Sequence, residues 1–317
     1  MSDDLANNWA TELCFGKNRK EQMSFEHPLS EDYTNTLFNF DIRRVTDGFF
    51  KLHSVSHCGS DANMTAMMDA AGGDLSNAYV AIGSYVSGTD NPIAAYSTSQ
   101  FDITDGPCLP IAVSNLPDFV KKSHVIPLPY HIPQEQPPQA LDMYEDMVFK
   151  EAHRRILLAR VNGFPVKSFM LELVLAGCGA VLSDRALCIL SCLAKHHQFN
   201  VIVDEVFTAG RCGILLLTLA KPRSFLQVVS HVTMGKWLTI GVVLKSTTGT
   251  IVAEEPRKTV SPRGASTHLD TKTARMILDT VVTKLAFTSE RCSQVIKHLK
   301  CSESECWGVG VMIFAPF

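Results

Sequence analysis

The chain has 317 residues and a formal net charge of -3, with its Lys, Arg, Asp and Glu residues interspersed. This pattern gives no basic stripe for nucleic acid or an anionic membrane surface, and no apolar run approaches the roughly 20 residues that a membrane-spanning helix needs. The cysteines include no CxxC pair that would suggest zinc binding or redox chemistry. We therefore expect a cytoplasmic globular protein without a metal site, and the first residues lack the pattern of a secretory signal.

The N-terminal part of the sequence predicts an arm followed by a helix. Residues 1–50 are mixed in polarity, which is typical of an arm with a short helix or strand. Gly59, Ser60 and Asp61 then precede a helix-forming stretch at 62–71 that a Gly-Gly pair ends. The first turn of a helix has unpaired backbone N–H groups and the positive end of the dipole, so a Gly-Ser step there indicates a phosphate site. An ordinary Ser or Asp N-cap explains the same residues equally well.

A strand, a connector and a long helix are expected next. The run at 79–85 is typical of a buried strand, and it ends at Tyr85, which could stack on a planar ligand or simply pack. The proline-rich stretch at 127–138 predicts an irregular connector outside the core. Residues 140–160 then have apolar side chains three or four positions apart, which predicts a helix that covers the sheet. These side chains are Leu141, Met143, Tyr144, Met147, Val148, Ala152, Ile156 and Leu157.

Two apolar runs separated by a helical pattern predict a βαβ unit. The runs cover 167–175 and 201–204, and the helical pattern between them covers 184–196. Continuous Val, Ile and Leu without alternation fits parallel strands that are covered on both faces. The fold class that we expect is therefore α/β with a mostly parallel, doubly wound sheet. Glu172 lies inside the first run, where a lone charge is costly unless it is paired or functional.

Two polar segments that end predicted strands are candidate site residues. Asp204 and Glu205 directly follow the apolar run, and ligands of open α/β sheets gather beyond the carboxyl ends of strands. An acid at this place can equally cap a helix or pair with Arg211. Lys236 follows Gly235 at the end of another predicted strand, before an apolar pair. A desolvated lysine there would lose its proton easily, as Schiff-base chemistry requires, whereas the alternative is a solvated loop lysine.

These elements together resemble, in their order and spacing, the class III aminotransferases, which are pyridoxal-phosphate enzymes of fold type I. The resemblance covers roughly residues 50–314, and it includes the 32 positions from Asp204 to Lys236 and the 31 from Lys236 to Thr267. It implies a large cofactor domain at 51–270, an N-terminal arm or partial small domain at 1–50, and a truncated C-terminal small domain at 271–317.

The resemblance also implies a role for each matching residue. Gly59 and Ser60 would hold the cofactor phosphate, and Asp61 stands where the family usually has Glu. Tyr85 and Val206 would pack on the two faces of the ring, and Glu172 would lie in the cofactor site. Asp204 would pair with the ring nitrogen, while Lys236 would form the internal aldimine and carry the proton. Thr267 would reach the phosphate of the neighbouring subunit, which implies a homodimer with shared active sites.

The chain departs from the family pattern on the substrate side. Phe207 stands where the family usually has a polar residue near the phenolic oxygen of the cofactor, and Gly177 replaces a second acid. The C-terminal Arg that grips a substrate carboxylate has no counterpart, so Arg211, Arg263 or a neighbouring subunit would have to supply one. A strand over 307–313 is expected to open the small domain.

The expected activity is transfer of an amino group from an amine or amino acid to a 2-oxo acid. Other pyridoxal-phosphate chemistry on the same scaffold is the first alternative, namely that of an aminomutase, racemase, decarboxylase or lyase. The second alternative is a degenerate relative that binds or scaffolds without catalysis, because fold alone does not determine function.

Overall fold

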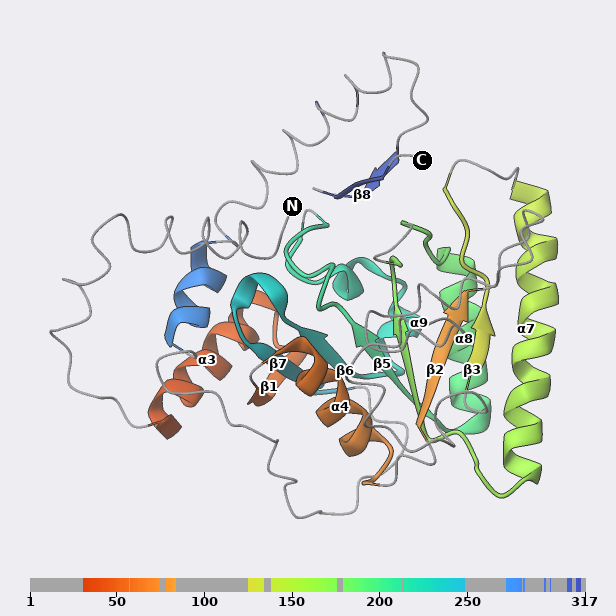
Figure 1. Cartoon of the computed structure of the whole chain (residues 1–317), viewed down its shortest axis with the longest axis horizontal. Coiled ribbons are helices and arrows are strands. Elements are labelled where there is room, and N and C mark those ends of the chain that lie inside the picture. Colours follow the sequence, from red (N-terminus) through yellow and green to blue (C-terminus); the bar gives the residue numbers. More distant parts are fainter. Residues whose placement is uncertain are drawn as a thin grey trace, which may run out of the picture.

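A seven-stranded sheet in the order β1-β7-β6-β5-β4-β2-β3 forms the centre of the molecule (Figure 1). Its strands are β1 (Phe50–Ser56), β2 (Ala78–Gly83), β3 (Val125–Leu128), β4 (Ser168–Glu172), β5 (Asn200–Asp204), β6 (Val229–Met234) and β7 (Gly241–Ser246). The computed structural model describes residues 31–56, 58–73, 78–83, 125–133, 138–175, 179–212, 214–248, 272–280, 282, 294, 297, 307–309 and 312–314.

The sheet is mostly parallel, as the sequence predicts. Strands β3, β2, β4, β5 and β6 are parallel to one another, whereas β7 runs antiparallel to both β6 and β1. Every residue of β4, β5 and β6 is buried. Because both faces of these strands are covered, side chains that point to either face are buried. This explains the uninterrupted runs of Val, Ile and Leu.

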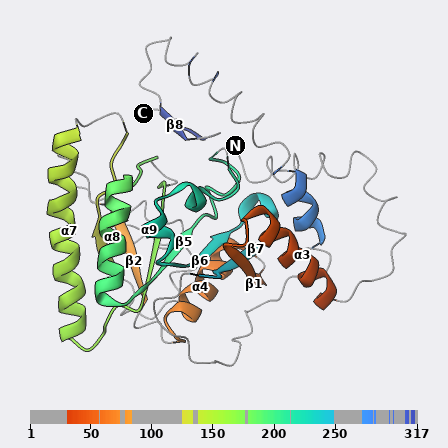
Figure 2. The same cartoon turned by 180° about the vertical axis from the view of Figure 1, so that it is seen from behind.

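Helices cover both faces of the sheet (Figures 1 and 2). Helix α4 (Gly59–Ala70) lies on one face, where its alanines and Met67 pack on Met170, Ile202 and Val243. Helix α8 (Asp184–His197) lies on the other face, in a core cluster with alternate residues of β4 and β5 such as Phe169, Val201 and Val203. The strand alternation thus separates two apolar clusters, and each fully buried Leu or Val side chain contributes about 1.5–3 kcal/mol.

The remaining elements lie around this centre. Helix α7 (Pro138–Val161) packs on β3 and α8, α9 (Arg223–Leu226) packs on α8, and α3 (Glu31–Val45) packs on β1. Two 3-10 turns, η3 (Leu217–Ala220) and η4 (Lys236–Leu238), follow β5 and β6, and β8 (Trp307–Val309) pairs antiparallel with β9 (Met312–Phe314). The expected strand over 307–313 is therefore two short strands. The N-terminal helix α3 contacts residues 272–280, where Arg275 Nε lies 2.6 Å from Asp41 Oδ2.

The expectation of an irregular connector at 127–138 is wrong at its beginning. Residues 125–128 form β3, which is at the edge of the sheet among the described strands and pairs there with β2, and Ile126, Leu128 and Tyr130 are core residues. Pro127 is tolerated because an edge strand has one side on which no neighbour needs its missing N–H.

Helix α7 confirms the predicted helix but buries only part of the apolar set. Its buried residues are Tyr144, Glu145, Val148, Phe149, Ala152 and Ile156. Met143, Met147 and Leu157 are 76%, 59% and 41% exposed, so they do not pack on the sheet. Two adjacent apolar stripes gave the same helical period, and periodicity alone does not say which stripe faces inward. In the described part of the chain, no helix is long and apolar enough to cross a membrane.

Candidate active site

A row of polar side chains crosses the sheet at the carboxyl ends of three parallel strands. Glu172 of β4 pairs in register with Asp204 of β5, and Asp204 pairs in register with Thr233 of β6. Paired residues of adjacent strands point to the same face, which here is the face under α4. All three are buried, with exposed fractions of 3%, 5% and 0%. The Tyr130 hydroxyl donates to the Glu172 carbonyl oxygen at 2.6 Å, which fixes the end of β4.

The N-terminus of α4 begins beside this row. Its N-cap is Cys58, whose side chain makes no capping hydrogen bond, so the alternative of an ordinary Ser or Asp N-cap does not apply. Gly59 leaves room for Val206, because a Cβ at position 59 would lie 2.8 Å from Val206 Cγ2 and closer still to Cγ1. A Cβ at Gly235 would lie 3.1 Å from the Cα of Gly59. The start of α4, the turn after β5 and the residue before Lys236 therefore touch one another.

Asp204 is held by two hydrogen bonds at the end of β5. Asn63 Nδ2 donates to Asp204 Oδ2 at 2.5 Å, and the backbone N–H of Val206 donates to Asp204 Oδ1 at 2.8 Å. Burial raises the pKa of Asp204 to about 6, and these two hydrogen bonds together with the charge of Lys236 oppose that rise. Asp204 is therefore only partly ionised near pH 6. A cation in contact with its carboxylate would keep it ionised.

Glu205 has the capping role that the sequence left open for either acid. Its carboxylate accepts from the backbone N–H groups of Leu217 and Thr218, both at 2.8 Å, and from the Thr218 hydroxyl at 2.5 Å. Burial raises its pKa, against the effect of these donors. Glu205 thus anchors the start of η3, whereas Asp204 faces α4.

Lys236 begins η4 in a left-handed conformation, with φ at 54°. The next residue fixes this turn, because the Trp237 indole N–H donates to the carbonyl oxygen of Ala209 at 2.5 Å. The Lys236 amine lies 4.8 Å from the centre of the Phe207 ring, and the Arg211 guanidinium lies 4.9 Å from the same ring. Arg211 also donates to the Phe207 carbonyl oxygen at 3.1 Å. The Lys236 amine and the Arg211 guanidinium therefore both lie within cation–π distance of the Phe207 ring.

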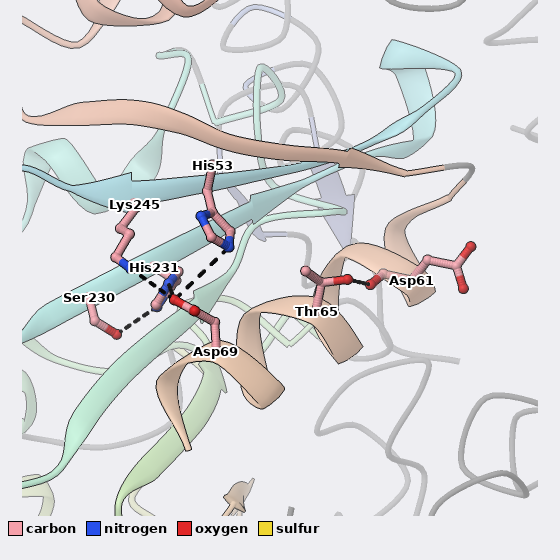
Figure 3. Close-up of polar contacts among 7 residues, drawn as sticks. All are labelled: His53, Asp61, Thr65, Asp69, Ser230, His231 and Lys245. Atoms are coloured by element: carbon pink, nitrogen blue, oxygen red, sulfur yellow. Dashed lines mark hydrogen bonds and ion pairs between the residues drawn. The ribbon is translucent and has the colours of Figure 1, made fainter. Parts of the chain in front are cut away.

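The far end of α4 is fixed by a charged cluster (Figure 3). Asp69 Oδ2 lies 2.9 Å from Nε2 of the buried His231, 3.0 Å from the Lys245 amine and 4.0 Å from His53 Nε2. The hydrogen bonds from His231 and Lys245 hold the pKa of Asp69 well below its usual range, although burial opposes them. His53 lies where the register between β1 and β7 shifts, between Leu52 and Ser54.

Most of the predicted site residues for which the structure gives side chains meet at one place. Gly59, Val206, Asp204, Lys236 and Glu172 all lie where α4 begins and where β4, β5 and β6 end. Asp61 is in the first turn of α4 and accepts a hydrogen bond from Cys58 Sγ at 3.5 Å.

Four other predicted site residues have side chains outside the described part of the chain. Ser60 is in the first turn of α4, but its side chain lies outside the described part, as do Tyr85, Thr267 and Arg263.

Sequence reasoning missed Asn63 and Thr233 as site residues. Both are fully buried, and the Thr233 hydroxyl donates to Asn63 Oδ1 while Asn63 donates to Asp204. A polar residue among the alanines and methionines of an apolar helix face was the available signal, because a buried amide needs a partner.

The residues present fit pyridoxal phosphate. Backbone N–H groups at the start of α4 suit its phosphate, a buried acid suits its ring nitrogen, and Val206 gives an apolar contact beside the Lys236 amine. Among the described residues, no cluster of His, Cys, Asp and Glu could hold a metal ion.

Comparison with known proteins gives matches at the level of structure. No protein-family model and no curated protein matches the chain. Lysine aminotransferase from M. tuberculosis, in the internal aldimine form, matches 98% of this chain over 73% of its own, with 15% identity and a TM-score of 0.61. An aminotransferase of Bacillus anthracis matches 96% over 69%, with 15% identity and a TM-score of 0.62.

An (S)-enantioselective omega-transaminase from Thermomicrobium roseum matches 98% of this chain over 70% of its own, with 16% identity and a TM-score of 0.58. The solved structures thus confirm the fold that the resemblance implies. The chain has the α/β fold of the class III aminotransferases, which are pyridoxal-phosphate enzymes of fold type I.

Proposed function

We propose that the chain is a pyridoxal-phosphate-dependent aminotransferase that moves an amino group from an amine or amino acid to a 2-oxo acid. The observation that carries this proposal is the convergence of a buried acid, a lysine amine and an uncapped helix N-terminus at the carboxyl ends of parallel strands. The aminotransferase fold of the solved relatives supports the same conclusion.

Asp204 would accept a hydrogen bond from the protonated ring nitrogen of the cofactor. Burial favours the neutral form of Asp204, whereas the hydrogen bonds from Asn63 and Val206 favour the carboxylate. A protonated ring nitrogen in contact with Asp204 would favour the carboxylate further. The bound cofactor supplies an electron sink for breaking bonds at the substrate carbon. Glu172, next to Asp204 across the sheet, would lie in the same cofactor site.

The backbone N–H groups of Gly59 and Ser60 would bind the phosphate at the start of α4. Val206 would contact one face of the ring and Tyr85 the other. Thr267 of a second subunit would complete the phosphate site, so the active form would be a homodimer with shared sites. The fixed contact between Gly59 and Val206 supports this arrangement, because it sets the spacing between the phosphate and ring subsites.

Lys236 would hold the cofactor covalently and carry the proton at the substrate carbon. Its left-handed backbone and the Trp237 hydrogen bond fix the direction of the side chain. Phe207 would keep the amine beside an apolar surface, and Arg211, on the same ring, would bind a substrate carboxylate. A bidentate guanidinium suits that group well.

The test uses the purified full chain with added pyridoxal phosphate. We expect imine absorbance, and we expect borohydride reduction followed by peptide mass mapping to place the cofactor on Lys236. Lys236→Ala should abolish both signals, whereas Lys195→Ala, at an exposed lysine of α8, should keep them. Imine absorbance that persists in Lys236→Ala would contradict the assignment.

The reaction is tested by adding a panel of amino donors to the loaded protein. Conversion of the imine to the amino form of the cofactor, with release of a carbonyl product, is the expected result. Consumption of an amino acid without that conversion would favour an aminomutase, racemase, decarboxylase or lyase. Failure of the wild-type chain to form any imine would favour a role without catalysis.

A further inference from the structure

Three buried polar side chains from three different elements form a directed chain that ends on Asp204. Thr233 of β6 donates to Asn63 Oδ1, and Asn63 of α4 donates through Nδ2 to Asp204 Oδ2 of β5 at 2.5 Å. Thr233 and Asn63 are both 0% exposed. Water therefore does not substitute for either hydrogen bond, and each loss leaves a buried polar group unpaired.

The chemistry of the three groups makes this chain run in one direction. A carboxylate only accepts hydrogen bonds, so Asn63 has to present its NH2 group to Asp204 when the acid is ionised. The Asn63 oxygen then faces Thr233, which can serve as its donor. The opposite amide orientation would place an oxygen against the carboxylate, and only a protonated Asp204 could satisfy it.

The two donors also fix the plane of the Asp204 carboxylate. Asn63 holds Oδ2, and the Val206 N–H holds Oδ1. Each carboxylate oxygen has two lone-pair positions, so both oxygens keep acceptor capacity for a further donor. Lys236 is the charged group that acts on Asp204, and Glu172 is its acidic neighbour across the sheet.

We propose that Asn63, oriented by Thr233, is a positioning residue that keeps Asp204 ionised and aimed at the ring nitrogen of the cofactor. This inference rests on the proposed function for its last step only. The first step, control of the ionisation of Asp204, belongs to the protein without cofactor. The alternative is a structural role, in which the hydrogen bonds of Thr233 and Asn63 only hold α4 against β5 and β6. In that case, removing these hydrogen bonds would lower the stability of the protein without changing the ionisation of Asp204.

The experiment compares Thr233→Val, Thr233→Ser and Asn63→Leu in the full chain. Thr233→Val removes the hydroxyl at nearly constant shape, and Thr233→Ser restores it. Ser191→Ala is the matched control, because its buried hydroxyl bonds only within its own helix, to the carbonyl oxygen of Leu187. The first readout is the titration of Asp204 in the cofactor-free protein by carboxyl infrared difference spectra, with Asp204→Asn identifying the band.

We expect the measured pKa of Asp204 to rise by about one unit in Thr233→Val and Asn63→Leu. In Thr233→Ser and Ser191→Ala it should keep its wild-type value. Unchanged titration in Thr233→Val would overturn the proposal, as would equal shifts in Thr233→Val and Thr233→Ser. Should Asn63→Leu not fold, the two Thr233 variants still decide the question.

The second readout is the dissociation constant of pyridoxal phosphate as a function of pH, measured by tryptophan fluorescence. Because the pKa of Asp204 is about 6, a rise of one unit should weaken binding about tenfold below pH 6 in Thr233→Val, where the ionised fraction of Asp204 is about ten times smaller than in the wild type. The deficit should narrow at higher pH, where Asp204 is ionised in every variant. A deficit that is equal at all pH values would indicate a structural role. If the wild-type chain binds no cofactor, the proposed function fails while the Asp204 titration still tests this inference.

Discussion

Replacement of Asp69 by asparagine tests how firmly the far end of α4 is anchored. The new amide side chain would keep the shape of the aspartate but lose the charge that His231 and Lys245 contact at 2.9 and 3.0 Å. Hydrogen bonds to a charged group contribute about 1.5–3 kcal/mol each, and Asp69 is 28% exposed, so solvent screening reduces their sum. We therefore expect Asp69→Asn to lower the free energy of unfolding by about 2–3 kcal/mol.

The pH dependence of this loss has a definite sign. The folded-state pKa of Asp69 is depressed, so its contribution is fully present above the unfolded-state value of 3.8 and disappears as the pH falls through the range below it. The difference in free energy of unfolding between the wild type and Asp69→Asn should therefore have its full size at pH 5 and become smaller below pH 4.

Urea unfolding followed by tryptophan fluorescence measures this difference at each pH. The control is Asp279→Asn, because Asp279 is 67% exposed and pairs with Arg44 at the surface, where such a pair contributes about 0.5 kcal/mol or less. A loss in Asp69→Asn as small as that of the control would refute the anchoring role. So would a loss that stays constant below pH 4.

Three further outcomes follow from single contacts. Gly59→Ala should cost about 1–3 kcal/mol of stability in urea unfolding and weaken cofactor binding in fluorescence titrations, because its Cβ would overlap Val206, and adding Val206→Ala should recover part of the stability. Glu205→Gln should lower the free energy of unfolding, measured in urea, by about 2–4 kcal/mol, because one amide cannot accept hydrogen bonds from all the donors around Thr218. A loss below about 0.5 kcal/mol would contradict the capping role of Glu205. Burial lowers the pKa of His197 to about 4, so thermal stability should fall as the pH drops from 6.5 towards 4, and a His197→Asn variant that falls equally would exclude His197 as the cause.

The parallel core was predictable because its signal is local. The runs around Phe169 and Val201 are apolar on both faces, and the helix between them has a clear period, so the βαβ unit followed from the local sequence pattern. Edge strand β3 was not predictable in this way. A proline such as Pro127 argues against a strand unless the strand lies at an edge, and the order of strands in the sheet is a tertiary property.

The roles of the two adjacent acids also depended on tertiary structure. Asp204 and Glu205 are both strand-end carboxylates in sequence, yet one faces α4 and the other binds the start of η3. The donors that separate them come from residues 141 positions away for Asp204 and 13 positions away for Glu205. Only the family resemblance favoured Asp204 over the capping role, and it assigned no role to Asn63.

Helix α4 links the candidate site to the Asp69 cluster through one strand. Thr233 and His231 are two residues apart on β6, so they point to the same face, and they contact Asn63 and Asp69 near opposite ends of α4. A helix that is bonded at two points to one strand has little freedom to slide along it. The position of Gly59 at the phosphate end is therefore partly set by Asp69 at the other end. Asp69→Asn should for this reason weaken cofactor binding without contacting the cofactor, whereas Asp279→Asn should not.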